Sequence, residues 1–285
     1  MFVDAHVHVW VENNERFPYR PVLGIVPDSP APLELLLSEM RTAGVDRAVV
    51  VQPSVYGWAN DYLAECLTRA PNRIAGVCLV DPLGKDPAAA LRHWVIEHGF
   101  RGVRLNPIGN RGGNWLDDSS QDPLWREAGA LGVPICVQLL PSQIHRLGAM
   151  AARFPETRIV VDHLAKPVTR DPTSAQARRF AELAVYPNVF AKIAALAHIS
   201  NEAFPFRDTL PLVEACFEAY GPNRVVWGSD FPVDLKFCSY VQLVEYITQV
   251  TSALSHEERV QVLGGTASSL WFGTCAEGGF SSDGC

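Results

Sequence analysis

Short runs of β-branched and other apolar residues recur along the chain, separated by turn residues and polar stretches. Runs of this kind without an alternating polar face are typical of strands that are buried on both sides. We therefore predict eight strands. They cover Phe2 to Val9, Arg47 to Gln52, Ile74 to Val80, Gly102 to Asn106, Val133 to Leu139, Arg158 to Asp162, Val189 to Ala194 and Val225 to Gly228.

The stretches between these runs place their apolar residues at helical spacing. Clear examples are Ala88 to His98, Pro123 to Leu131, Gln143 to Arg153, Ala175 to Val185 and Leu210 to Tyr220. Helix stop signals, such as Gly99 before Phe100, precede several of the strands. Strands that alternate with helices form a parallel sheet covered by helices, and eight repeats in 285 residues favour a closed (β/α)8 TIM barrel of the α/β class. An open doubly wound sheet is the alternative.

The composition indicates how large a core the chain can form and how many domains to expect. Hydrophobic residues make up 48% of the chain, which is enough for one large core. We predict a single barrel domain over residues 1–273. The Gly/Ser-rich segment 274–285 is expected to be a disordered tail.

Charge and cysteine content exclude several classes of partner. The chain has 24 basic and 31 acidic residues without a basic stripe, so we expect no nucleic acid partner. No apolar run approaches the roughly 20 residues that span a bilayer, so we expect no membrane partner. Seven cysteines without a C-x-x-C pair are typical of reduced thiols, and we predict a cytoplasmic protein. The sequence leaves open whether the chain forms a homo-oligomer.

Polar residues gather where the predicted strands end, which is the edge where barrel enzymes have their active sites. His6 and His8 are two residues apart on the first strand, so both side chains project to one face. Asp230 follows the last strand. The other strand ends supply Gln52, Ser54, Asp81, Arg104, Asn106, Gln138, Asp162, His163, Lys192 and Ser229. Because an unpaired buried polar group costs roughly 1–3 kcal/mol, we expect these groups to bind one another or a ligand.

Several motifs at these strand ends resemble the amidohydrolase superfamily, and within it the amidohydrolase-related lactonase branch that includes fuconolactonase and 2-pyrone-4,6-dicarboxylate lactonase. They are DAHVH at 4–8, QPS at 52–54, RGVRLNP at 101–107, DHLAKP at 162–167 and WGSDFP at 227–232. The resemblance runs from about Phe2 to Phe272. It is specific for the family and says little about the substrate.

The resemblance implies a (β/α)8 hydrolase in which four catalytic residues surround the reacting carbonyl: His6, His8, His163 and Asp230. Opening a lactone requires a base for water, polarisation of the carbonyl oxygen, and a proton for the departing alkoxide. Asp230 is the predicted base. The histidines are predicted to polarise the carbonyl or to hold the water, directly or through a metal.

The same four residues suffice for one divalent ion, Zn²⁺ or Mn²⁺, because catalytic zinc sites commonly use three protein ligands and a water. A two-metal amidohydrolase also needs a bridging Lys or Glu and a further histidine, and this chain offers Arg104 and Gln138 there. We therefore predict no two-metal site. Whether one metal is required stays open, because the branch includes members that work without metal.

The expected substrate contacts lie at the strand ends and in the following loops. Arg104 suits a substrate carboxylate, with a salt bridge to Asp81 or Asp162 as the alternative. Lys192 suits a substrate oxygen, with an ion pair to Asp162 or Asp230 as the alternative. The complete predicted set is Arg104, Ser54, Gln138, Trp10, Tyr56, Asn60 and Lys192.

We predict a hydrolase that opens a lactone of a sugar acid or of an aromatic catabolic intermediate, so its partner is a small-molecule lactone or carboxylated substrate. Two alternatives remain. One is a metal-dependent decarboxylase of the same superfamily, and the other is a non-catalytic barrel that binds small acids.

Overall fold

The computed structural model describes residues 1–108 and 114–273 and contains one sheet of eight parallel strands in sequential order. The strands are β1 (Val3–Val7), β2 (Arg47–Val51), β3 (Ile74–Leu79), β4 (Gly102–Leu105), β5 (Ile135–Val137), β6 (Ile159–Val161), β7 (Val189–Ile193) and β8 (Val225–Trp227). All eight predicted strands are present, which confirms the barrel and rules out the open sheet. Segment 274–285, which was predicted to be a disordered tail, lies outside the described residues.

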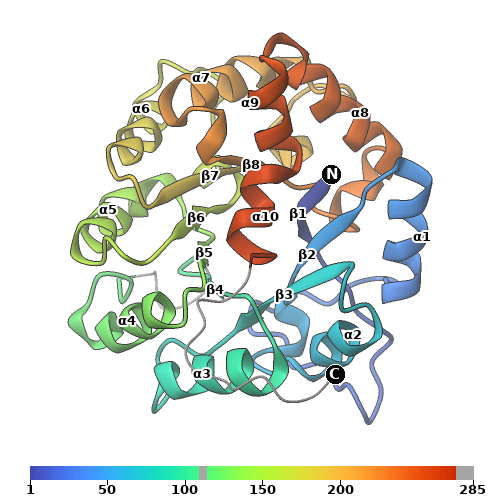
Figure 1. Ribbon diagram of the computed structural model, residues 1–285, viewed down its shortest axis with the longest axis vertical. Helices are drawn as coiled ribbons and strands as arrows, with labels where there is room; N and C mark the ends of the chain where they lie inside the picture. The colour runs from blue at the N-terminus through green and yellow to red at the C-terminus, as the bar shows by residue number, and fades with distance from the viewer. Residues whose placement is uncertain (109–113, 274–285) are drawn as a thin grey trace.

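Helices surround the strands and alternate with them along the chain (Figure 1). They are α1 (Leu33–Ala43), α2 (Asp61–Arg69), α3 (Pro87–His98), α4 (Asp122–Ala130), α5 (Ile144–Arg153), α6 (Ala175–Glu182), α7 (Leu210–Tyr220), α8 (Tyr240–Val250), α9 (His256–Val260) and α10 (Thr266–Trp271). The five predicted helical stretches match α3 to α7, with the last turn of the fourth forming a 3-10 helix at Leu183–Val185. In the described part of the chain, every helix is too short or too polar to cross a bilayer.

Helix α10 covers the amino-terminal end of the barrel, where it lies across the strands in Figure 1. Its residues Ala267, Leu270 and Trp271 are buried together with apolar side chains from inside the strands. The Trp271 ring lies 5.4 Å from the ammonium of Lys192, a residue of β7 that points into the barrel. With this end filled, the carboxyl ends of the strands are the open side of the barrel.

The barrel closes where β8 meets β1. Gly228 lies so close to β1 that a Cβ atom at this position would be 2.4 Å from the Cβ of His6, so only glycine fits. The Asp4 carboxylate accepts hydrogen bonds from the backbone N–H of Ser229 (2.9 Å) and from the hydroxyl of Tyr240 (2.8 Å). The backbone N–H of Asp230 donates to the carbonyl of His6 at 2.9 Å. Barrel closure therefore brings Asp230 next to the histidine pair.

Candidate active site

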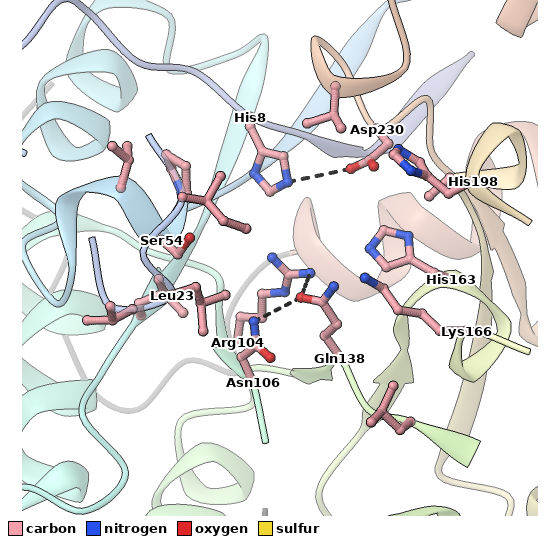
Figure 2. Close-up of a pocket in the computed structure, with 18 of the residues that line it drawn as sticks. His8, Leu23, Ser54, Arg104, Asn106, Gln138, His163, Lys166, His198 and Asp230 are labelled. Atoms are coloured by element: carbon pink, nitrogen blue, oxygen red, sulfur yellow. Dashed lines mark hydrogen bonds and ion pairs between the residues drawn. The ribbon is translucent and has the colours of Figure 1, made fainter. Parts of the chain in front are cut away.

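A cavity of about 1150 Å³ opens at the carboxyl ends of the strands. Figure 2 shows side chains from several different strand ends pointing into it, with His8 and Asp230 on one side and Arg104 and Gln138 opposite. Barrel enzymes have their active sites at this end. The cavity is therefore the candidate active site.

Asp230 lies at the centre of the histidine cluster. Its Oδ1 is 3.5 Å from Nε2 of His6 and 3.5 Å from Nε2 of His8. The ring of His163 lies 4.7 Å from that of His6, measured between centroids. The four predicted catalytic residues are thus brought together from β1, the end of β6 and the end of β8, and all four are buried.

The carboxyl of Asp230 is ionised at neutral pH. Burial by itself raises its pKa, but the interaction with His8 and the neighbouring His163 and His6 outweigh burial and hold the pKa below the usual aspartate value. Its backbone is left-handed, with a φ of 57°. A carboxylate that stays ionised beside neutral imidazoles is suited to accept a proton.

The two histidines of β1 have different partners. Nδ1 of His8 lies 2.7 Å from the carbonyl oxygen of Val51, which can only accept, so Nδ1 carries a proton, and Nε2 faces Oδ1 of Asp230 at 3.5 Å. Nδ1 of His6 lies 3.1 Å from the ammonium of Lys192. Burial, followed by the charge of Lys192, lowers the pKa of His6 well below its usual value, so this imidazole is neutral.

His163 is presented by a left-handed turn at the end of β6. Four consecutive residues, His163 to Lys166, have φ values between 49° and 59°. The turn is closed by a 2.8 Å hydrogen bond from the backbone N–H of Lys166 to the carbonyl of His163. Left-handed backbone costs roughly 1–2 kcal/mol per non-glycine residue, so the surrounding structure must hold this turn in place. The result is that His163 and Lys166 both line the cavity.

A buried ion network supports the cluster from below. Asp162 lies 2.9 Å from the ammonium of Lys192 and 3.1 Å from Nε of Arg104. Burial raises the pKa of Asp162, but the charge of Lys192, the interaction with His6 and the charge of Arg104 outweigh it and hold the pKa well below the usual value. The ion pairs with Asp162 that were left as alternatives for Arg104 and Lys192 are therefore both present.

Four of the seven predicted substrate contacts line the cavity: Trp10, Ser54, Arg104 and Gln138. Arg104 lines the cavity and is also hydrogen-bonded to a neighbour. Its Nη2 donates to Oε1 of Gln138 at 2.6 Å (Figure 2). Asn106 donates to the same oxygen at 2.9 Å. These side chains form a fixed polar wall opposite Asp230.

The other three, Tyr56, Asn60 and Lys192, are not among the described residues that line the cavity. The Tyr56 hydroxyl accepts from the backbone N–H of Val11 at 2.9 Å. Asn60 bonds both backbone polar groups of Leu79, at 2.8 and 2.9 Å. Lys192 is fully buried beneath the histidines. The first two stabilise loops, and Lys192 compensates the charge of Asp162.

Two further side chains from loops reach the site. The side chain of Lys166 points into the cavity (Figure 2). Among the described residues its ammonium has no ion-pair partner, and burial and Arg104 lower its pKa. His198 lies 3.0 Å from the buried carboxylate of Asp234 at the edge of the cavity. Spacing gives no signal for either, because both depend on loop conformation.

The spacing of the donor atoms matches that around a single divalent ion. In a tetrahedral zinc site with bonds of about 2.0–2.1 Å, ligand atoms lie roughly 3.3–3.5 Å apart, and Oδ1 of Asp230 is 3.5 Å from both nitrogens. Nε2 of His8 faces this site, and its Nδ1–H donates to a carbonyl as metal-bound histidines usually do. Nε2 of His6 is buried without a hydrogen-bond partner. These residues fit a metal ion.

Comparisons with known proteins agree with this geometry. The family model described as "Amidohydrolase" matches residues 3–273. An L-fucono-1,5-lactonase from Burkholderia ambifaria is 31% identical over 276 residues, covering 93% of each chain. A 4-sulfomuconolactone hydrolase from Rhizobium radiobacter is 28% identical and covers 80% of this chain and 75% of its own.

Solved structures show the same relationship. An amidohydrolase from Burkholderia multivorans, crystallised with HEPES, is 25% identical and superimposes with a TM-score of 0.78, covering 95% of this chain and 98% of that chain. The family model spans residues 3–273 and so includes the strand ends that carry His6, His8, His163 and Asp230, and the first of the relatives covers 93% of the chain. On this evidence the chain belongs to the amidohydrolase family.

Proposed function

We propose that the protein hydrolyses a lactone, with Asp230 as the general base for the attacking water. The observation that carries the proposal is the position of Asp230: an ionised carboxylate at the inner end of the cavity, within 3.5 Å of two histidine nitrogens. The lactone-hydrolysing relatives, which cover most of the chain, give further support.

The proposed reaction starts with attack of a water oxygen on the carbonyl carbon. Asp230 takes one proton from this water as the new C–O bond forms. The bond between the carbonyl carbon and the ring oxygen then breaks, and the proton held by Asp230 passes to the leaving alkoxide. The product is an open hydroxy acid, and Asp230 is again ionised.

Neutral histidines are suited to hold the carbonyl oxygen while negative charge develops on it. The ammonium of Lys192 donates to Nδ1 of His6, which leaves the proton of His6 on Nε2. Nδ1 of His163 is buried without a hydrogen-bond partner. Removal of one preorganised donor of this kind typically costs 10²–10³-fold in kcat.

A single Zn²⁺ or Mn²⁺ is compatible with the same residues when the proton of His6 is on Nδ1, beside Oδ1 of Asp162 at 3.6 Å, instead of on Nε2. His8, His6 and Asp230 would then hold the ion, with His163 beside them. A bound divalent ion would supply polarisation of the carbonyl oxygen. The histidines and Asp230 keep their positions in either case, because Val51, Lys192 and the backbone of β1 fix them.

The test is proton release from a panel of sugar-acid, muconate-type and pyrone lactones, before and after metal stripping. Turnover of at least one lactone is expected. Turnover that survives stripping identifies the histidines as direct polarisers, whereas loss on stripping and recovery with Zn²⁺ or Mn²⁺ identifies them as metal ligands. A protein that hydrolyses none of these lactones would contradict the proposal.

Lys166 is predicted to bind a substrate carboxylate. Exchange of Lys166 for Met should raise KM for carboxylated lactones by roughly 10- to 100-fold, because a charge-assisted hydrogen bond contributes about 1.5–3 kcal/mol. Steady-state kinetics with a carboxylated lactone and its uncharged analogue measure this. An equal loss on both substrates would assign Lys166 a structural role instead.

The pH profile should distinguish an aspartate base from a histidine base. The base acts in its ionised form, and the pKa of Asp230 lies below the usual 3.8. Burial lowers the pKa of His163 to about 4, so His163 stays neutral above about pH 4. We expect kcat/KM to be constant from pH 7.5 to about 5 and to fall near pH 4 or below. A fall centred near the usual histidine pKa of about 6.5 would contradict Asp230 as the base.

A further inference from the structure

Apolar side chains are exposed at the mouth of the cavity. We call residues 22–29 the strap; it lies in the loop between β1 and α1, and Figure 2 shows its residue Leu23 on the same side of the cavity as Ser54 and Arg104. Ile25 and Val26 of the strap are 65% and 55% exposed. In the loop that follows His163, Val168 is 74% exposed and also lines the cavity. Exposed apolar patches of this kind mark surfaces that a ligand or partner covers.

The strap is held over the cavity at both ends. The backbone N–H of Val22 donates to the carbonyl of Ser54 at 3.2 Å. At the other end, the indole N–H of Trp10 donates to the carbonyl of Ser29 at 2.7 Å. Between these anchors, Leu23, Ile25 and Pro27 line the cavity (Leu23 is labelled in Figure 2). The apolar patch is therefore a fixed part of the cavity wall.

The cavity is also larger than a simple lactone. A simple monocyclic lactone has about ten non-hydrogen atoms. If each of these atoms occupies no more volume than a water molecule in the liquid, roughly 30 Å³, the lactone occupies at most on the order of 300 Å³. The cavity of about 1150 Å³ is several times larger. A lactone ring at Asp230 would leave the strap side of the cavity unfilled.

The lining changes in polarity along the cavity. Asp230, His163 and Arg104 face one another at the strand ends (Figure 2), and the loops contribute further polar lining residues, which are Asp81, Arg170, Ser200, Asn201 and Lys236. The described strap residues that line the cavity are all apolar, and Leu83 and Leu140 add apolar contacts from the loops that follow β3 and β5. A substrate that fills both parts has a polar ring at one end and an apolar substituent at the other.

We infer that the substrate is a lactone with an extended apolar substituent, an alkyl chain or aryl group, that lies against the strap. This inference rests on the proposed lactone hydrolysis and specifies its substrate class. A compact lactone at Asp230 would leave Leu23, Ile25 and Pro27 uncovered, and a larger substrate with hydroxyl groups at this end would meet apolar side chains that give them no hydrogen-bond partner.

The test is kcat/KM for a series of δ-lactones that differ only in the alkyl substituent, from δ-hexalactone with a methyl group to δ-dodecalactone with a heptyl group. Burial of a methylene contributes about 0.8 kcal/mol, equivalent to roughly four-fold, and partial burial lowers this to about two-fold. We expect a rise on the order of 100-fold over the six added methylenes.

Three substitutions locate the effect. Ile25→Asp and Val168→Asp should each reduce kcat/KM for δ-dodecalactone about 10-fold or more and leave δ-hexalactone nearly unchanged. Val185→Asp is the matched control, because Val185 is 76% exposed but lies before β7, at the opposite end of the barrel. Its kinetics should equal those of the wild type.

The possible outcomes separate the two proposals. If sugar lactones or δ-hexalactone are hydrolysed but kcat/KM stays flat along the series, the inference is overturned while lactone hydrolysis stands. If no lactone is hydrolysed, calorimetric titration with the corresponding δ-lactams, which resist hydrolysis, decides the inference separately. Affinity that rises with chain length and is lost in Ile25→Asp supports the apolar subsite, and affinity that does not rise overturns it.

Discussion

Exchange of Asp230 for Asn should reduce kcat/KM for lactone hydrolysis by about 10³-fold or more, since general base catalysis contributes typically 10²–10⁴-fold and the same group returns the proton to the leaving oxygen. The substitution keeps the volume of the side chain. It also keeps the backbone, because asparagine tolerates the left-handed conformation that Asp230 adopts. Initial rates with the best lactone from the panel measure the effect.

The fold of this variant should be intact. Circular dichroism and the midpoint of thermal unfolding are expected to be close to those of the wild type, and the affinity for a non-hydrolysable lactam should change little. Asp234→Asn is a useful comparison, because Asp234 is a second buried aspartate near the cavity that the proposed reaction does not use. Activity above a tenth of wild type in Asp230→Asn would exclude Asp230 as the base.

Exchange of Lys192 for Met should lower the free energy of unfolding by about 3 kcal/mol. Breaking a buried ion pair typically costs 3–5 kcal/mol, because the remaining charge is left without compensation. Here Asp162 keeps Arg104 as a partner, which places the expected loss at the lower end. Methionine has a similar length, so little of the loss arises from packing. Chemical denaturation of the wild type and the variant measures the difference.

Lys166→Met provides the matched control for this prediction. It is the same substitution at a lysine that lines the cavity and that has no ion-pair partner in the described part of the chain. Its free energy of unfolding should change by less than about 1 kcal/mol. Equal destabilisation in the two variants would show that the Lys192–Asp162 pair has no special role in stability.

Much of the fold follows from local patterns. Buried parallel strands and the helices between them have characteristic apolar spacing, so the eight strands and the helices α3 to α7 could be predicted to within a few residues. The strand ends also identified His6, His8, His163 and Asp230, because the carboxyl ends of barrel strands converge regardless of the loops that follow.

The loops set the limit of sequence-based prediction. Tyr56 and Asn60 lie in a loop at the correct end of the barrel, but hydrogen bonds to Val11 and Leu79 turn their polar groups away from the cavity. Lys166 reaches the cavity only because the backbone turns left-handed from His163 onwards. Neither orientation is encoded in residue type or spacing, since both arise from contacts with distant segments.

The contact between β8 and β1 has a consequence for how activity appears during synthesis. Asp4 and Ser229, whose hydrogen bond helps to close the barrel, are 225 positions apart in the chain. Contacts of such long sequence separation form late in folding. A nascent chain that has emerged through β7 holds both histidines of β1 and His163 but still lacks Asp230. Hydrolytic activity should therefore arise in one late step, when the final strand docks, and enzyme assays during translation or refolding would report completion of the barrel.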